Sequence, residues 1–143
     1  MEFDLELAKQ ESNENPVYYV QYAHARIAQI LKHAESRGMG DFSSGNTGLL
    51  THLAELALVR KMIELPELVE IAAAMRAPHQ LPHYAIELAT AFHQFYTVCQ
   101  VVVDEEPDRS RARLKLVSAA KVVLKNTLGL IGVSAPERME KLA

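Results

Sequence analysis

Aromatic and basic side chains recur at helical spacing in residues 15–27, NPVYYVQYAHARI. Tyr19 and Arg26 are seven residues apart, so on an α-helix their directions differ by only about 20°. Tyr22 lies between them on the same side. Flat rings and a guanidinium on one face can stack on unpaired RNA bases and donate hydrogen bonds to base edges and phosphates. The alternative is that these tyrosines belong to the core, which is the commoner role of a helical aromatic stripe.

The element expected to carry these residues is a helix over residues 16–37. Asn15 can cap its first amide groups, Pro16 suits its first turn, and Gly38 suits its C-terminal stop. Its expected apolar stripe consists of Val20, Ile27, Leu31 and Ala34.

Helical periodicity continues along nearly the whole chain. A short amphipathic stretch is expected over residues 3–10. Further helices are predicted over residues 48–65, 67–76, 84–103 and 110–128. Residues 39–47 are rich in Gly and Ser and predict a loop, whereas Ser134 and Glu137 have the spacing of a helix-capping box. Apart from a weak alternation over residues 99–103 no strand pattern is present, so an all-α bundle of about five or six helices is predicted.

Composition narrows the functional classes. The 143 residues suit one domain, and 49% hydrophobic with 23% charged residues is ordinary for a globular protein. No apolar stretch is long enough to span a membrane, and the acidic start is not a signal peptide. Cys99 is the only cysteine, which excludes an internal disulfide and suits a reducing cytoplasm.

Charge gives an ambiguous signal. The net charge of −3 argues against a general nucleic-acid binder, but residues 109–125 contain six basic residues and no acid. Arg109, Arg111, Arg113 and Lys115 lie near a predicted helix N-terminus, where cations are unfavourable. They could bind phosphate, or equally well pair with the acidic residues 104–106.

Other chemistry is weakly indicated. His79 and His83 are four residues apart, but Pro82 disfavours a regular helix between them, so a metal site is not expected. Cys99 and His93 would point to opposite sides of a helix, and a buried, inert cysteine is expected.

The string NPVYYVQYAHARI closely resembles the signature at the start of the anticodon-binding domain of arginyl-tRNA synthetases. The C-terminal string LGLIGVSAPERM resembles the end of the same family. Between them, residues 86–96 resemble the family's ELAxxFHxFY helix, and residues 113–132 resemble its RLxLVxAAxxVLxNxLxLIG helix. The resemblance covers almost the whole chain, and its two end motifs are specific.

This resemblance implies a helical bundle of the class I aminoacyl-tRNA synthetase anticodon-binding type, over residues 1–139 with its first helix truncated. Residues 140–143 extend beyond the usual end of the family and would be a natural extension or a cloning remnant. The tetrapeptide DALR, after which the domain is named, is absent and would lie just upstream of residue 1.

By motif, the resemblance implies a set of anticodon-binding residues. They are Tyr19, Arg26, Tyr96 and Met139, with Gln21 and Tyr22 as neighbours. The implied partners are the anticodon stem and loop of tRNA(Arg) and the enzyme's own catalytic domain, in the cytoplasm. Alanine substitution of Tyr19, Arg26 or Tyr96 is expected to weaken RNA binding more than folding.

The intact enzyme would attach arginine to its tRNA using ATP with Mg²⁺. The family's HIGH-like and KMSK-like strings are absent from this chain, so we expect the chain to carry no cofactor and to be catalytically inactive. A second hypothesis is a helical protein–protein interaction module that does not bind RNA. Weak self-association is also expected, through an apolar patch near Phe3, Leu7 and the Val20/Ile27 stripe.

Overall fold

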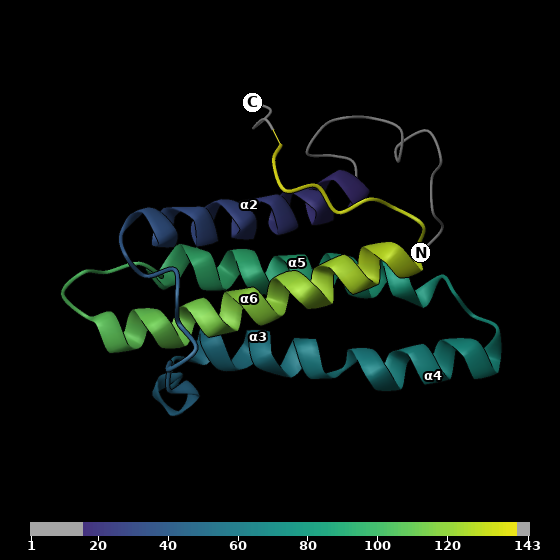
Figure 1. Ribbon diagram of the computed structural model, residues 1–143. Coiled ribbons are helices and arrows are strands. Elements are labelled where there is room, and N and C mark those ends of the chain that lie inside the picture. The colour runs from purple at the N-terminus through teal and green to yellow at the C-terminus, as the bar shows by residue number, and fades with distance from the viewer. Residues whose placement is uncertain (1–15, 140–143) are drawn as a thin grey trace.

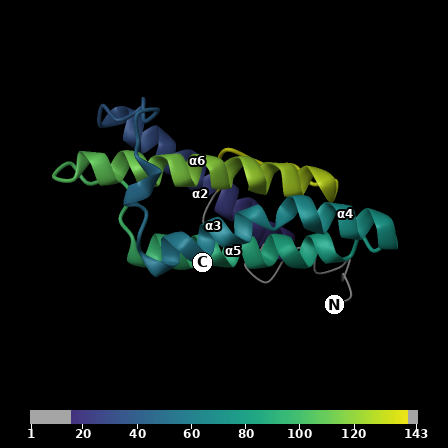
Figure 2. The ribbon, with the colours of Figure 1, turned by 90° about the horizontal axis from the view of Figure 1, so that it is seen from below.

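The computed structural model describes residues 16–139, which form a layered bundle of helices (Figure 1). Helix α2, Pro16–Ser36, lies on one side of the central helices α5, Gln80–Val98, and α6, Pro107–Leu130. Helices α3, Leu53–Ile63, and α4, Leu65–Met75, follow each other along the opposite side (Figures 1 and 2). Within residues 16–139 there are five α-helices, one 3₁₀ helix and no strand, which confirms the all-α prediction.

The core lies where α2, α3, α5 and α6 meet. Its largest fully buried side chains include Phe92, Phe95, Ile27, Leu58 and Leu124. Within α5 the buried residues 81, 84, 88, 92 and 95 recur every three or four positions, as the amphipathic pattern requires. Val20, Ile27 and Ala34 of the predicted α2 stripe are buried, and Leu31 is half-buried against the core.

Helix α2 ends as its sequence predicts. Gly38 has a φ of +77°, a left-handed conformation that glycine adopts without steric cost. The amide of Met39 then donates to the carbonyl of Ala34 at 2.8 Å, which closes the helix end and turns the chain away. Asn15, the predicted N-terminal cap, and the stretch over residues 3–10 lie outside the described residues.

The second predicted helix, over residues 48–65, is wrong at its start. A 3₁₀ turn, Thr47–Leu49, is followed by a break, and α3 begins at Leu53. His52 accepts a hydrogen bond from the Ala54 amide through Nδ1, and Glu55 accepts one from the His52 amide, so the two form a capping box. The face of α3 that packs against α5 and α6 carries Leu58, so Leu58 enters the core and Leu53 and Ile63 of the predicted stripe are exposed.

A buried ion pair joins α3 to α6. Glu55, 1% exposed, accepts a hydrogen bond from Arg113 Nε at 2.8 Å, and Arg113 also donates to the carbonyl of Gln100 at 2.7 Å. Removal of one partner from such a pair leaves a buried charge and commonly costs about 3–5 kcal/mol. Arg113 thus has a structural role.

The predicted long helix over residues 84–103 is shifted. It begins at Gln80, because Pro82 lies in the first turn, where a missing amide proton is tolerated. It ends at Val98, and Cys99 is extended and 1% exposed. The last helix likewise begins earlier than predicted, at Pro107.

The capping-box spacing of Ser134 and Glu137 does not mark a helix. Residues 133–139 form an irregular segment that returns along α2 (Figure 1). Gly132, with a φ of +77°, allows the chain to reverse after α6. The return of this segment brings the C-terminal motif beside the N-terminal one.

Candidate nucleic-acid interface

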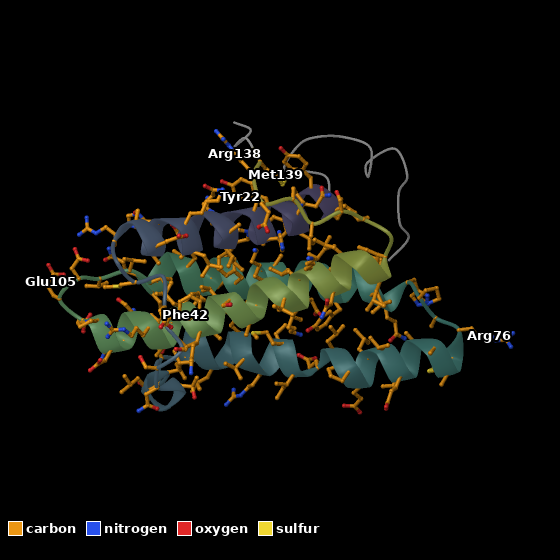
Figure 3. All side chains as sticks on the ribbon, in the orientation of Figure 1. Tyr22, Phe42, Arg76, Glu105, Arg138 and Met139 are labelled. Atoms are coloured by element: carbon orange, nitrogen blue, oxygen red, sulfur yellow. The ribbon has the colours of Figure 1, made fainter. Side chains whose placement is uncertain are left out.

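A cavity of about 470 Å³ opens between α2, the end of α5 and the returning C-terminal segment. Its lining combines aromatic, amide, basic and apolar side chains. The residues that line it are Tyr22, Ala25, Arg26, Gln29, Ile30, His33, Tyr96, Gln100, Val101, Val102 and Met139. We call this the aromatic pocket. Figure 3 shows Tyr22 and Met139 together above α2, away from Arg76 and Glu105 at the ends of the molecule.

Arg26 is stacked against both tyrosines of the pocket. Its Cζ lies 5.0 Å from the ring centroid of Tyr22 and 4.9 Å from that of Tyr96. Both distances are within the range of a cation–π interaction. Arg26 Nη2 also donates a hydrogen bond of 2.8 Å to the Tyr22 hydroxyl, which restricts the orientation of the guanidinium.

Helix spacing explains how these side chains meet. Tyr22 and Arg26 are four residues apart on α2 and therefore neighbours on its surface. Tyr96 lies near the end of α5, its ring 6.0 Å from the buried ring of Phe92, and is 40% exposed. One ring face is thus supported by the core, while the side chain remains accessible to a ligand.

Tyr19 is placed differently from Tyr22 and Arg26. Its ring is half-buried against the core and lies 5.0 Å from the ring of His93, and its hydroxyl is 3.2 Å from Thr90 Oγ1. It does not line the aromatic pocket. Helix α5 covers this part of the α2 face, a contact that residue spacing on a single helix cannot reveal.

Gln21 and Met139 are linked by the C-terminal segment. Gln21 Nε2 donates to the carbonyl of Ser134 at 2.9 Å, so its side chain binds the protein's own backbone instead of lining the pocket. Met139, five residues later, does line the pocket. Of the six predicted residues, Tyr22, Arg26, Tyr96 and Met139 therefore come together.

His93 of α5 packs against the rings of Tyr19 and Tyr22. Its ring contacts those of Tyr19 and Tyr22, and its Nε2 is buried with no hydrogen-bond partner among the described residues. Burial lowers the pKa of His93, and the nearby charge of Arg26 lowers it in the same direction, so that together they bring it to about 4. At neutral pH the imidazole is uncharged, so it does not repel the guanidinium.

Sequence reasoning missed three polar residues of the pocket, Gln29, His33 and Gln100. The signal for two of them was present, because residues 22, 26, 29 and 33 follow the three- and four-residue spacing of one helix face. Gln100 lies beyond the end of α5, and no spacing rule relates it to α2.

The charge of the pocket differs from that of the chain. Arg26 supplies a cation, and no Asp or Glu is among the described residues that line it. A second cavity, of about 440 Å³ between α4 and α5, is lined by Glu64, Glu67 and Glu87. Electrostatics therefore favours an anionic ligand in the aromatic pocket and disfavours one in the second cavity.

Three of the four residues of the basic run at the start of α6 are paired within the chain. Arg109 pairs with Glu106 at 3.0 Å, Arg111 with Asp108 at 3.6 Å, and Arg113 with the buried Glu55. Only the Arg109–Glu106 pair involves the acidic residues 104–106, whereas Arg111 and Arg113 bind carboxylates elsewhere.

The remaining candidates show no catalytic arrangement. Over residues 16–139 no three His, Cys, Asp or Glu side chains are grouped as metal ligands. His83 instead faces Glu87 at 3.7 Å. Cys99 is buried, and burial raises the pKa of its thiol, which suppresses the thiolate that a nucleophile requires. None of the helices in this range is long and apolar enough to cross a membrane.

Fold and pocket together define an all-helical domain with a stacking pocket of aromatic and cationic side chains. Residues 20–139 match the family of the DALR anticodon binding domain. The chain belongs to this family.

Named relatives agree with this assignment. The chain is 58% identical over 139 residues to an arginine–tRNA ligase of Dehalococcoides mccartyi and 52% identical over 141 residues to that of Symbiobacterium thermophilum. Each alignment covers 97% of this chain and 25% of the relative, so the chain spans about a quarter of these relatives' length. The arginyl-tRNA synthetase structure of Thermus thermophilus superposes with a TM-score of 0.74 and 31% identity, over 92% of this chain and 22% of that one.

Proposed function

We propose that this chain binds the anticodon stem and loop of tRNA(Arg) as the anticodon-recognition domain of an arginine–tRNA ligase. The observation that carries the proposal is the aromatic pocket, in which Tyr22, Arg26, Tyr96 and Met139 meet. An unstacked base can stack on a tyrosine ring or a guanidinium plane while Gln100 bonds its edge.

The proposal extends to the whole enzyme. A catalytic domain of the same polypeptide would join arginine to tRNA with ATP and Mg²⁺, in the cytoplasm, while this chain supplies binding energy and a check of tRNA identity. Tyr19 and Gln21 would act on RNA through the residues they support. This chain itself is proposed to hold no cofactor.

Binding of RNA stem–loops to the purified chain tests the proposal. At low salt, a stem–loop with an arginine anticodon should bind at least tenfold more tightly than one with a non-cognate anticodon, because each lost base contact costs about 1–3 kcal/mol. Equal affinity for both would overturn the proposal.

The same chain should show no arginine-dependent ATP–pyrophosphate exchange, and exchange above background would refute its assignment as a binding domain alone.

A protein-interaction role has one observation in its favour. Leu53, Ile63 and Met75 on α3 and α4 are 81%, 69% and 69% exposed, on the side of the bundle opposite α2 (Figure 1). Such apolar side chains suit a protein partner. In our proposal this partner is the rest of the same enzyme, and RNA binding by the chain distinguishes the proposal from an interaction module without RNA.

A further inference from the structure

We infer that Gln21, His24 and Gln29 of α2 are positioning residues that hold the C-terminal segment against the helix and thereby place Met139 in the aromatic pocket. We call these three residues the backbone clamp. The inference rests on the proposed function, because it assigns the clamp a role in RNA binding through Met139.

The clamp consists of three hydrogen bonds to backbone carbonyls. Gln21 Nε2 donates to Ser134 at 2.9 Å, His24 Nδ1 lies 2.8 Å from the Pro136 oxygen, and Gln29 Nε2 donates to Glu137 at 3.0 Å. From residue 21 to residue 29 the helix rises about 12 Å. Residues 134–137 of an extended chain span about 10 Å. The two segments therefore run in the same direction with nearly matching lengths.

His24 is the buried member of the clamp. It is 1% exposed, and the Pro136 carbonyl is its hydrogen-bond partner, whereas its Nε2 has none among the described residues. A carbonyl oxygen only accepts hydrogen bonds, so Nδ1 must carry the proton. Without the C-terminal segment this buried imidazole would lose that bond, which is costly for a buried polar group. Helix and segment thus stabilise each other.

A fourth contact ties the segment to a second helix. Lys121 Nζ on α6 lies 2.9 Å from Glu137 Oε2 and donates to Glu137 Oε1 at 3.0 Å. This hydrogen bond lowers the pKa of the Glu137 carboxyl. Residues 134–137 are therefore held from both α2 and α6. Met139 follows two residues later and lines the pocket beside Tyr22 and Tyr96.

The clamp binds main-chain atoms, so it fixes the path of the segment independently of most of its side chains. This separates two roles along α2. Tyr22 and Arg26 offer the stacking surfaces of the pocket, whereas residues 21, 24 and 29 bind the backbone of the C-terminal segment, and Gln29 does so from the pocket wall. A loose segment would leave the pocket open on one side and would have to be ordered when RNA binds, which reduces affinity.

The test combines Gln21→Ala with Gln29→Ala, because neither side chain is buried and the fold should be retained. Gln80→Ala, in the second cavity, is the matched control. The methyl resonance of Met139 is followed by NMR in chains labelled at methionine methyl groups, and stem–loop affinity is measured in parallel. His24→Ala and its conservative counterpart His24→Asn, which restores a donor, complete the series.

In the wild-type chain the Met139 methyl should be shifted by the neighbouring rings, and in the double variant it should move to its free-peptide position. Affinity should fall about tenfold. In a Met139→Ala background the double substitution should cause no further loss. Asparagine at position 24 should restore part of what alanine removes.

Two results would overturn the inference: an unchanged Met139 methyl in the double variant, or losses that add fully to that of Met139→Ala. Failure of the proposed function looks different. If the wild-type chain binds no stem–loop while the double variant still releases the Met139 methyl, RNA binding is refuted and the positioning of Met139 by the clamp is supported.

Discussion

At the scale of single residues, Arg26 determines the character of the aromatic pocket. In the free chain its guanidinium is already stacked on Tyr22 and Tyr96. A stacked cation keeps both rings oriented and presents a flat, positively charged surface to an incoming base. Less side-chain freedom then has to be lost on binding than for three independent side chains.

We predict that Tyr22→Ala, Arg26→Ala and Tyr96→Ala each weaken stem–loop binding by about 1–3 kcal/mol, because each removes a stacking surface. Tyr19→Phe is the control, since it removes only the contact with Thr90 and keeps the ring. Binding isotherms, with thermal melts to check folding, measure the effect. If the Tyr19→Phe variant has as low an affinity for the stem–loop as the Tyr96→Ala variant, this assignment of roles is contradicted.

His93 is predicted to make folding stability depend on pH. Its pKa is about 4 in the folded chain and about 6.5 when unfolded, so between these values the unfolded chain binds more protons. Stability is therefore highest above pH 6.5 and decreases as the pH falls toward 4. With allowance for solvent screening, His93 should lower the free energy of unfolding at pH 5 by about 1 kcal/mol relative to neutral pH.

The measurement is urea unfolding at pH 7 and pH 5. His93→Phe, which keeps a ring beside Tyr19 but cannot titrate, should lose less stability on acidification than the wild-type chain. His79→Gln, at an exposed position, should behave as wild type. An identical pH dependence of the wild-type and His93→Phe chains would show that His93 does not contribute.

At the scale of elements, the loop over residues 39–52 approaches α6 closely, and Gly45 makes this approach possible. A Cβ atom at Gly45 would lie 2.6 Å from the backbone oxygen of Arg111, closer than packing allows. Gly45 is thus required because it has no side chain that would collide with α6, and not because its backbone is flexible. Gly129, within α6, has open space around it.

We therefore predict opposite effects for one substitution at two glycines. Gly45→Ala should destabilise the chain by about 1–3 kcal/mol, because the loop must move away from α6. Gly129→Ala should stabilise it by about 0.5–1 kcal/mol, because alanine loses less backbone entropy in a helix. Chemical denaturation of the two variants beside wild type measures both. Equal changes of the same sign would refute the contact at Gly45.

At the scale of the whole molecule, the N-terminal and C-terminal motifs form one site because the chain returns over α2 after α6 (Figure 1). The side occupied by α3 and α4 carries acidic and apolar residues instead. The two sides therefore differ in chemistry, as the proposed contacts with RNA on the first and protein on the second require.

Weak self-association remains a prediction at this scale. Phe3 and Leu7, the proposed centre of the patch, lie outside the described residues, and Val20 and Ile27 are buried in the core. Sedimentation velocity over a hundredfold concentration range should show a rising average mass for the wild-type chain, and Phe3→Ser with Leu7→Ser should reduce the increase. A strictly monomeric wild-type chain at the highest concentration would show the prediction to be wrong.

The sequence by itself determined the helical class of the fold and two of the side chains that line the pocket. The spacing of apolar residues places α2 and its exit at Gly38 correctly, because periodicity and left-handed glycine are local properties. Tyr22 and Arg26 are likewise neighbours through helix geometry alone. The family motifs added Tyr96 and Met139, which lie far apart in the chain.

Only the tertiary structure decided which of these residues meet. Packing of α5 against α2 covers Tyr19 and leaves Tyr22 in the pocket, and the returning segment engages Gln21 while it delivers Met139. Glu55 and Arg113, 58 positions apart, pair in the interior. Local spacing cannot encode such contacts, because they depend on how whole helices pack together.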